Sequence, residues 1–169
     1  MLWEDERVVY DNQTVPQEAL GGRRVRLQTG RGVGGGGIVN AMAWYSGFPA
    51  DYARWEEDGA VGWGWGWDTI SSQIRAVEDH ELGASGDHGS GGPMPVTVPR
   101  HLHPAAAAFV EAGVSCGIPL SRDLNGEGRE GIGPLPVAVR DGERYSVVDG
   151  YLRPASVRDN LFGCPRSEG

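Results

Sequence analysis

Apolar residues recur along the chain at the spacing of strands in some segments and of helices in others. In Arg24–Gln28, polar and apolar residues alternate, which predicts a half-buried strand. After Asp68, three apolar residues fall at positions i, i+4 and i+7 of one helix face. This spacing predicts an amphipathic helix that Asp68 caps at its N-terminus and Gly83 ends.

Three further segments are rich in helix-forming residues. Ile38–Tyr45 is mostly apolar, with good helix formers, and predicts a short buried helix. Pro49 suits the first turn of a second helix. A third helix is expected from Pro104 to about Cys116, where Gly117 closes it.

Two similar segments flank the third helix. Gly92–Val98 and Gly133–Val139 both begin with Gly-Pro and have a second proline two residues later, so each predicts a strand with its prolines at the entry. Their likeness suggests that the two strands are neighbours in one sheet. Asp141-Gly142 follows the second segment and is typical of a tight turn.

Charge and composition narrow the classes of function. The 169 residues carry a net charge of −8, which disfavours binding to nucleic acid or to an anionic membrane. The start of the chain is charged, and no apolar run reaches the ~20 residues of a membrane helix. We expect a cytoplasmic protein with neither nucleic acid nor membrane as a partner.

Gly30–Gly37 is the most unusual segment of a chain that contains 28 glycines. A glycine-rich loop that leads into a helix lets backbone N–H groups approach a phosphate or another electron-rich group. Gly30–Gly35 also fits G-x-G-x-x-G, but no apolar strand precedes it and no strand with an acidic end follows. The loop therefore predicts ligand binding without identifying the ligand.

Several reactive residue types have ordinary structural interpretations. The histidines are expected at the surface, at positions His80, His88, His101 and His103. The acidic clusters are expected as solvated helix ends, in Glu56–Asp58 and Glu78–Asp79. Packing is the expected use of Trp63, Trp65, Trp67 and the core residue Cys116. A metal site at His101, His103 and Cys116 lacks the second half of a ligand set, so no metal site is predicted.

The glycines and apolar residues of Gly30–Asn40, followed by Trp44 and Gly47, resemble the first signature of the glucose–methanol–choline (GMC) family of FAD-dependent alcohol oxidoreductases. The resemblance extends over about Tyr10 to Leu161. It is carried by Thr14–Gln17, Pro49–Tyr52, Gly64–Asp68, Glu78–His80, His103–Pro104, Gly117–Pro119, Asp123–Gly126, Gly131–Pro134 and Tyr151–Ala155.

The resemblance implies an α+β fold in two parts. Residues 1–60 would form part of an FAD-binding α/β domain, with the signature loop at residues 30–47. Residues 61–161 would form part of a substrate domain built on an antiparallel sheet with helices. Residues 162–169 lie outside the resemblance and are interpreted as an unrelated tail.

The resemblance also implies which residues contact FAD. They are Gly32, Val33, Gly34, Gly35, Gly36, Asn40, Ala41, Met42 and Ala43. Gly36 and Gly37 replace the small hydroxyl residues that are usual in the family. Val39 stands where some relatives carry a histidine tied to the flavin, so non-covalent FAD is expected. No residue here matches the catalytic histidine of the family, and no catalytic residue is predicted.

The expected function is that of an oxidoreductase acting on the CH–OH group of a small alcohol. The resemblance starts after the family's N-terminal nucleotide-binding turn and stops before its catalytic region, so we expect an internal piece that alone neither oxidises alcohols nor holds FAD tightly. One alternative is a non-catalytic remnant or interaction module of the same fold. Another is a module that binds NAD or ATP through Gly30–Gly37 without flavin. The substrate, the electron acceptor and the oligomeric state stay open.

Overall fold

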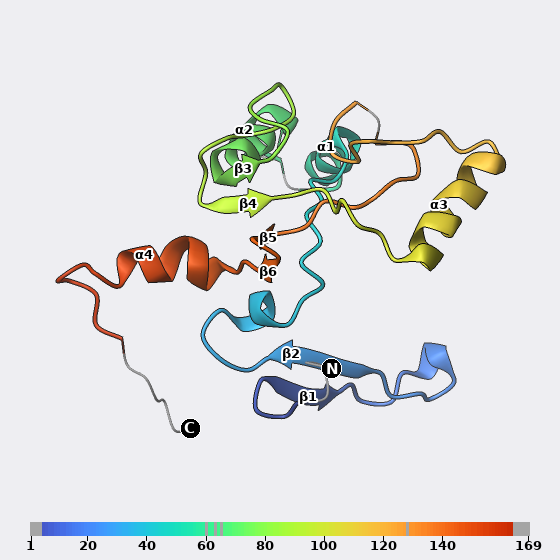
Figure 1. Cartoon of the computed structure of the whole chain (residues 1–169). Helices are drawn as coiled ribbons and strands as arrows, with labels where there is room; N and C mark the ends of the chain where they lie inside the picture. The colour runs from blue at the N-terminus through green and yellow to red at the C-terminus, as the bar shows by residue number, and fades with distance from the viewer. Residues whose placement is uncertain (1–4, 60, 63, 65, 128, 164–169) are drawn as a thin grey trace. The chain divides into compact units, whose positions relative to one another are not determined.

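The computed structural model describes residues 5–59, 61–62, 64, 66–127 and 129–163, and these form two compact units (Figure 1). Unit 1 combines the chain up to Met42 with the chain from Ser146 onward. Unit 2 is the continuous stretch Ala43–Tyr145. The mixture of helices and small sheets agrees with the predicted α+β class. The division into cofactor and substrate domains at residues 60 and 61 stays a prediction.

A two-stranded antiparallel hairpin dominates unit 1 (Figure 1). Strand β1 (Val9–Gln13) pairs with β2 (Arg26–Gly30), and a single 3-10 turn, η2 (Glu18–Leu20), lies in the connection. The predicted strand is thus confirmed with both ends shifted by two residues, but most of its side chains are exposed, so the predicted half-buried pattern is wrong. Strand β1 was not foreseen. The hairpin contributes only Val9 to the buried core.

Two short helical segments complete unit 1. A 3-10 helix, η3 (Gly35–Ile38), follows β2 after a glycine turn. A π-helical segment, η4 (Val148–Leu152), runs directly into α4 (Arg153–Ala155). Among the described residues, no helix of either unit is long and apolar enough to cross a bilayer.

The predicted helix over Ile38–Tyr45 is wrong. Helical structure ends at Ile38, and Met42 takes the left-handed conformation with φ 61°. Within unit 2, Ala43 forms an antiparallel bridge with Val137, and the Trp44 N–H donates to the Pro136 carbonyl at 2.8 Å. Pairing with a segment far along the chain therefore overrides a weak local helix preference.

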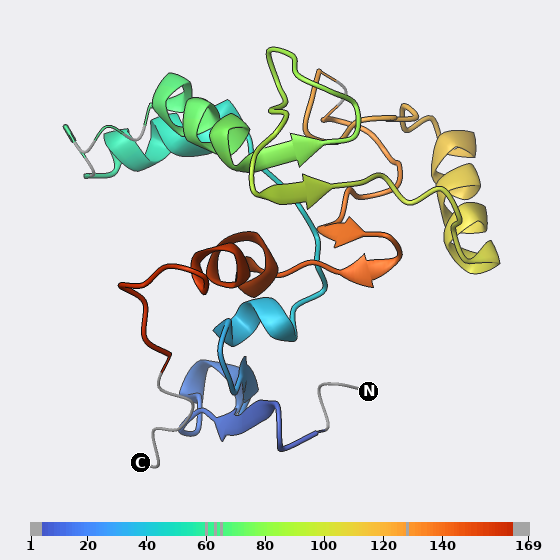
Figure 2. The same cartoon turned by 60° about the vertical axis from the view of Figure 1, so that its left-hand side comes forward.

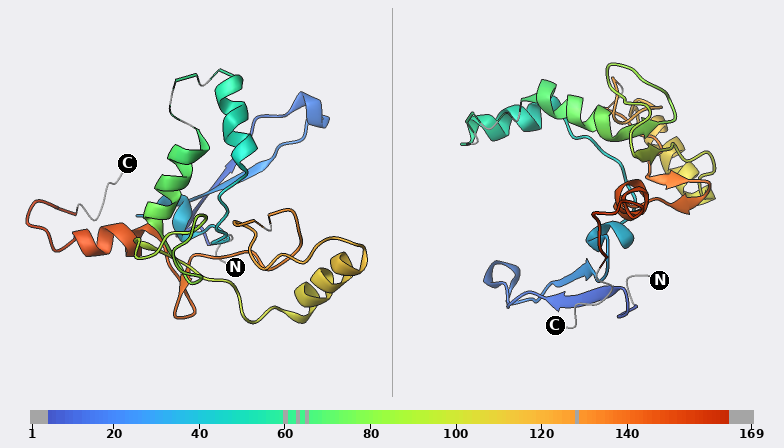
Figure 3. Two further views of the ribbon diagram at one scale, coloured as in Figure 1. Left: turned by 90° about the horizontal axis from the view of Figure 1, so that it is seen from above. Right: turned by 90° about the vertical axis from the view of Figure 1, so that its left-hand side faces the viewer.

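Helices α1 (Pro49–Glu57) and α2 (Trp67–Val77) open unit 2 (Figure 3). The first begins at Pro49 as predicted, and the Asp51 carboxylate accepts the Phe48 N–H at 3.0 Å. The second is capped by Gly66, so Asp68 lies in its first turn instead of capping it. Trp67 packs its ring against Tyr52 at 5.6 Å, while the predictions for Trp63 and Trp65 lie outside the described residues.

Helix α2 ends at Val77, earlier than the predicted end at Gly83. Residues of β3 (Glu78–His80) are extended and pair in parallel with β4 (Met94–Val96), as Figure 2 shows. Two of the three β3 side chains, Glu78 and His80, are buried. The strand forms because its partner covers it, which no local pattern in this polar triplet indicates.

The second half of unit 2 follows the predictions more closely. Helix α3 (Pro104–Ser115) has the expected bounds. Thr97 and Val137 pair antiparallel through hydrogen bonds of 3.0 and 2.8 Å, which confirms that their two segments are neighbours. Strands β5 (Val139–Arg140) and β6 (Glu143–Arg144) then form a hairpin whose turn residues, Asp141 and Gly142, both have positive φ.

Candidate functional site

The glycine-rich loop of unit 1 is a tight turn between β2 and η3. Gly32, Gly34 and Gly35 have φ of 141°, 98° and 51°, which side chains disfavour. A Cβ atom on Gly30 would collide with the backbone carbonyl of Gly35. Internal close approach therefore explains some of these glycines without any ligand.

Four backbone donors in the loop have no acceptor among the described residues. The N–H groups of Gly32, Val33, Gly34 and Gly36 make no hydrogen bond there, whereas Gly35 donates to Gly32 at 3.0 Å. Gly36 is exposed, and a Cβ atom built on it would meet nothing within 4 Å. The loop thus presents unpaired donors and open space, which suits an electron-rich ligand.

The loop does not lead into the predicted helix of residues 38–45. The helix that follows the turn is η3, with only four residues, and it ends at Ile38. A macrodipole needs many aligned peptide units, so its contribution here is small. The unpaired N–H groups themselves carry the binding potential of the loop.

The other residues predicted to contact FAD differ in whether their polar side-chain atoms are already hydrogen-bonded. The Asn40 side chain is exposed, and its Oδ1 accepts the Met42 N–H at 3.0 Å. Ala41 is exposed beside it. Ala43 is exposed and is the first residue of unit 2. Asn40 therefore supports its own turn through its side-chain oxygen.

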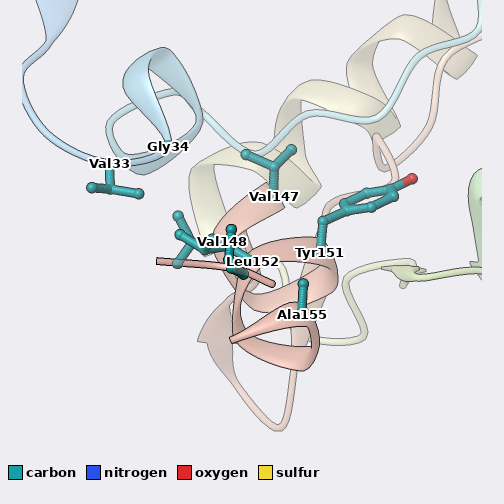
Figure 4. Close-up of a pocket in the computed structure, with 8 residues that line it drawn as sticks. Val33, Gly34, Val147, Val148, Tyr151, Leu152 and Ala155 are labelled. Atoms are coloured by element: carbon teal, nitrogen blue, oxygen red, sulfur yellow. The ribbon is translucent and has the colours of Figure 1, made fainter. Parts of the chain in front are cut away.

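An apolar groove of about 400 Å³ adjoins the loop within unit 1 (Figure 4). Its lining residues are Val33, Gly34, Val147, Val148, Tyr151, Leu152, Ala155 and Leu161. A Cβ atom on Gly34 would lie 2.7 Å from Val148 Cγ2, so η4 packs closely on the loop. The groove therefore continues the ligand-accessible surface with apolar side chains.

A second candidate is a buried polar cluster in unit 2 around Glu78 and His88. The Glu78 carboxylate is fully buried and accepts the Trp44 indole N–H at 2.7 Å and the Gly89 N–H at 3.0 Å. His88 Nε2 lies 2.7 Å from Asp123 Oδ2. The predicted surface positions of His80 and His88 and the predicted solvated Glu78 are thus wrong, because all three residues are buried. His101 and His103 are exposed, as predicted.

His80 completes this cluster. Its ring stacks on His88 with 3.8 Å between centroids, and it is 3% exposed. Burial lowers the pKa of the His80 imidazole, with repulsion by His88 adding to the effect and nearby carboxylates opposing it. Burial tends to raise the pKa of Asp123, but the bond to His88 and two backbone N–H groups together lower it.

A network of hydrogen bonds near this cluster holds residues 44–47 at the start of unit 2. Asn125, which is 1% exposed, accepts from Ser46 N at 2.9 Å and donates to the Trp44 carbonyl at 3.0 Å. Arg129 donates to the Ser46 hydroxyl at 3.0 Å and to the Gly47 carbonyl, and its guanidinium lies 4.9 Å from the Trp67 ring centroid. These contacts join residues that are far apart in the sequence. Local sequence patterns therefore could not indicate that the residues lie together.

Two of the residues considered as metal ligands, His103 and Cys116, have other settings in the structure. No group of three or more potential ligands is suitable for a metal ion in the part of the chain that is described. His103 instead caps α3, where its Nδ1 accepts the Ala105 N–H at 3.2 Å. Cys116 is exposed, so its predicted core position is wrong.

Comparison with known proteins supplies the family context. The model of the GMC oxidoreductase family matches residues 12–163. Human mitochondrial choline dehydrogenase is 38% identical over 157 residues, or 93% of this chain and 26% of that protein. Pyridoxine 4-oxidase of Microbacterium luteolum is 38% identical over 155 residues, or 90% of this chain and 30% of its own. The chain thus spans less than a third of the length of these relatives.

Solved structures agree with the sequence relatives. The crystal structure of pyridoxine 4-oxidase from Mesorbium loti superposes with a TM-score of 0.82 at 35% identity, covering 92% of this chain and 31% of that one. An FAD-dependent oxidoreductase from Chaetomium thermophilum gives 0.75 at 24% identity, with 92% and 28% covered, and so supports the fold alone.

Proposed function

Because the chain belongs to the GMC oxidoreductase family, we propose that it supplies the flavin-contacting loop of an FAD-dependent enzyme that oxidises the CH–OH group of a small alcohol. The observation that carries this proposal is the set of unpaired N–H groups at Gly32, Val33, Gly34 and Gly36. The names of two relatives give choline and pyridoxine as their substrates, and both molecules are alcohols.

The residues of the loop fit a flavin nucleotide chemically. FAD is rich in phosphate, carbonyl and ring-nitrogen acceptors, and exposed backbone N–H groups are donors for such atoms. The apolar groove beside Val33 offers a surface for a ring system. When bound, FAD supplies the chemistry by accepting a hydride from the alcohol carbon.

The loop would hold only part of the cofactor. Four hydrogen bonds contribute roughly 0.5–1.5 kcal/mol each. A nanomolar complex needs about 12 kcal/mol, so the loop alone supports weak binding. Within the proposed enzyme, Gly32–Gly36 and Asn40–Met42 orient the flavin, while most of the affinity comes from other contacts.

Replacement of Gly36 by valine tests the loop directly. The branched side chain would fill the open space over the exposed backbone and block the approach of a ligand to the Gly36 N–H. We expect FAD affinity to fall by about tenfold, which corresponds to the loss of about 1.4 kcal/mol. The measurement is quenching of flavin fluorescence during titration with the purified protein.

Gly86→Val is the matched control for this titration. A Cβ atom on Gly86 also meets nothing within 4 Å, but the residue lies in unit 2 outside the proposed contact set. Its FAD affinity should equal that of the wild type. Equal FAD affinities for Gly36→Val and Gly86→Val would show that the loop does not contact the flavin.

Flavin attachment gives an independent prediction. Val39 carries no nucleophile and is only 2% exposed. Any flavin bound at this loop should therefore leave the polypeptide when the protein is denatured with acid or heat. The check is the visible absorbance of the supernatant after precipitation; flavin retained in the washed pellet would contradict non-covalent binding.

A further inference from the structure

The loop of residues 81–92 joins the two parallel strands β3 and β4. A parallel pair needs a connection that returns across the sheet end, so the loop cannot be a tight hairpin. Residues 89–92 anchor it on β3 by four hydrogen bonds, one of them from the Gly91 N–H to Asp79 Oδ1 at 2.9 Å. Gly89 N–H donates to Glu78 Oε2 at 3.0 Å, His80 N–H to the Gly89 carbonyl at 3.0 Å, and Gly92 N–H to the Glu78 carbonyl at 2.9 Å.

The hydrogen bond of His80 to the loop fixes its tautomer. His80 Nδ1 accepts the Leu82 N–H at 3.2 Å, so the proton of the neutral ring resides on Nε2. Nε2 is buried and has no partner among the described residues. A second proton must therefore go to Nδ1, where it removes the acceptor of the Leu82 N–H.

The surroundings of His80 are also unfavourable to a cation. The His88 ring covers one of its faces at 3.8 Å with an interplanar angle of 19°. His88 cannot turn away freely, because its Nε2 is bonded to Asp123 at 2.7 Å. A protonated His80 would thus be buried against another imidazole, with no acceptor for either N–H.

We propose that His80 is an acid-sensitive latch whose protonation releases the loop of residues 81–92 from β3. The titratable groups that face it are His88 in the loop, Glu78 in β3, Glu81 at the loop start and Asp123 before β5. Their carboxylates already have donors. Glu78 accepts from Trp44 and Gly89, Glu81 from the Val98 N–H, and Asp123 from His88.

The direction of the pH effect follows from the lowered pKa of His80. An unfolded histidine titrates near ~6.5, so the released state binds more protons than the closed state between the two pKa values. The closed state, in which the loop is anchored on β3, is therefore fully stable above pH ~6.5. It becomes less stable as the pH falls toward the pKa of His80 in that state. One proton changes the closing equilibrium by at most about tenfold per pH unit.

Hydrogen exchange between pH 7.5 and 5 tests the latch on the full chain. After correction for intrinsic exchange, protection of the Gly89 and Gly92 amides should fall by up to about tenfold per pH unit below ~6.5. Amides within α3 should not follow this profile. Loop protection that stays constant over the whole range would overturn the proposal.

His80→Asn separates the latch from general acid sensitivity. Asparagine keeps an acceptor for the Leu82 N–H but cannot be protonated, so the loop should lose its pH dependence. His101→Asn, at an exposed histidine, should behave as the wild type. A wild-type pH profile in His80→Asn would refute the role of His80. If that variant does not fold, ring resonances of wild-type His80 must titrate together with loop opening, and separate midpoints would refute it equally.

Discussion

Glu78→Ala should lower the free energy of unfolding by about 3–5 kcal/mol, the typical result of removing one partner from a buried charged contact. The substitution leaves the Trp44 indole N–H and the Gly89 N–H without their acceptor in a fully buried place. Each unsatisfied donor costs about 1–3 kcal/mol. Chemical denaturation followed by tryptophan fluorescence measures the change.

Glu57→Ala is the control for this substitution. Glu57 is exposed at the end of α1, and exposed positions of this kind change stability by at most about 0.5 kcal/mol. Glu78→Gln should lie between the two, because its amide oxygen keeps one of the two N–H groups paired. If Glu78→Ala were as stable as Glu57→Ala, the carboxylate could not be the acceptor that organises the cluster.

Gly89→Ala should destabilise the protein by about 3 kcal/mol or more, at the upper end for an inserted methyl group. The new Cβ atom would collide with the backbone carbonyl of Arg75, which no rotamer change can relieve. It would also displace the Gly89 N–H from Glu78 and the Gly89 carbonyl from His80. The urea midpoint should fall with an unchanged slope.

Gly86→Ala is the comparison within the same loop. A Cβ atom on Gly86 has open space around it, so its midpoint should stay close to that of the wild type. Gly86 is exposed to solvent. Gly89 is buried, however. Equal urea midpoints for Gly89→Ala and Gly86→Ala would show that Gly89 does not pack closely on α2.

Local signals in the sequence were sufficient for several elements of the fold. Pro49 and Pro104 begin helices α1 and α3, and Asp141-Gly142 turns the β5–β6 hairpin. Each of these features depends on the conformational preference of one or two residues. They are therefore visible before any tertiary contact is known.

The predictions from the sequence are wrong where segments that are distant along the chain pair with each other. The predicted helix at Ile38–Tyr45 does not form, and Ala43 instead pairs with Val137 in a β-bridge. Strand β3 forms because β4 lies beside it. Burial of Glu78 follows from donors supplied by Trp44 and Gly89, which lie far away or across a loop.

The candidate flavin loop was located by its resemblance to a family, and its geometry could not be derived from spacing. The sequence indicates that Gly30–Gly37 brings backbone close to something. It does not distinguish Gly30, whose space is occupied by Gly35, from Gly36, whose surroundings are open. That difference depends on the fold of the turn, and it decides which glycine is suited to meet a ligand.

The discontinuity of unit 1 has a consequence for the order of folding. Unit 2 is one continuous stretch, so its contacts can form as soon as Tyr145 has been synthesised. The loop at Gly34 packs on Val148, a partner from the opposite end of the chain, so unit 1 has to wait for that segment. Closing so long a loop is entropically costly and slow. During translation, the glycine-rich loop therefore precedes its packing partner, while the contacts of unit 2 can already form.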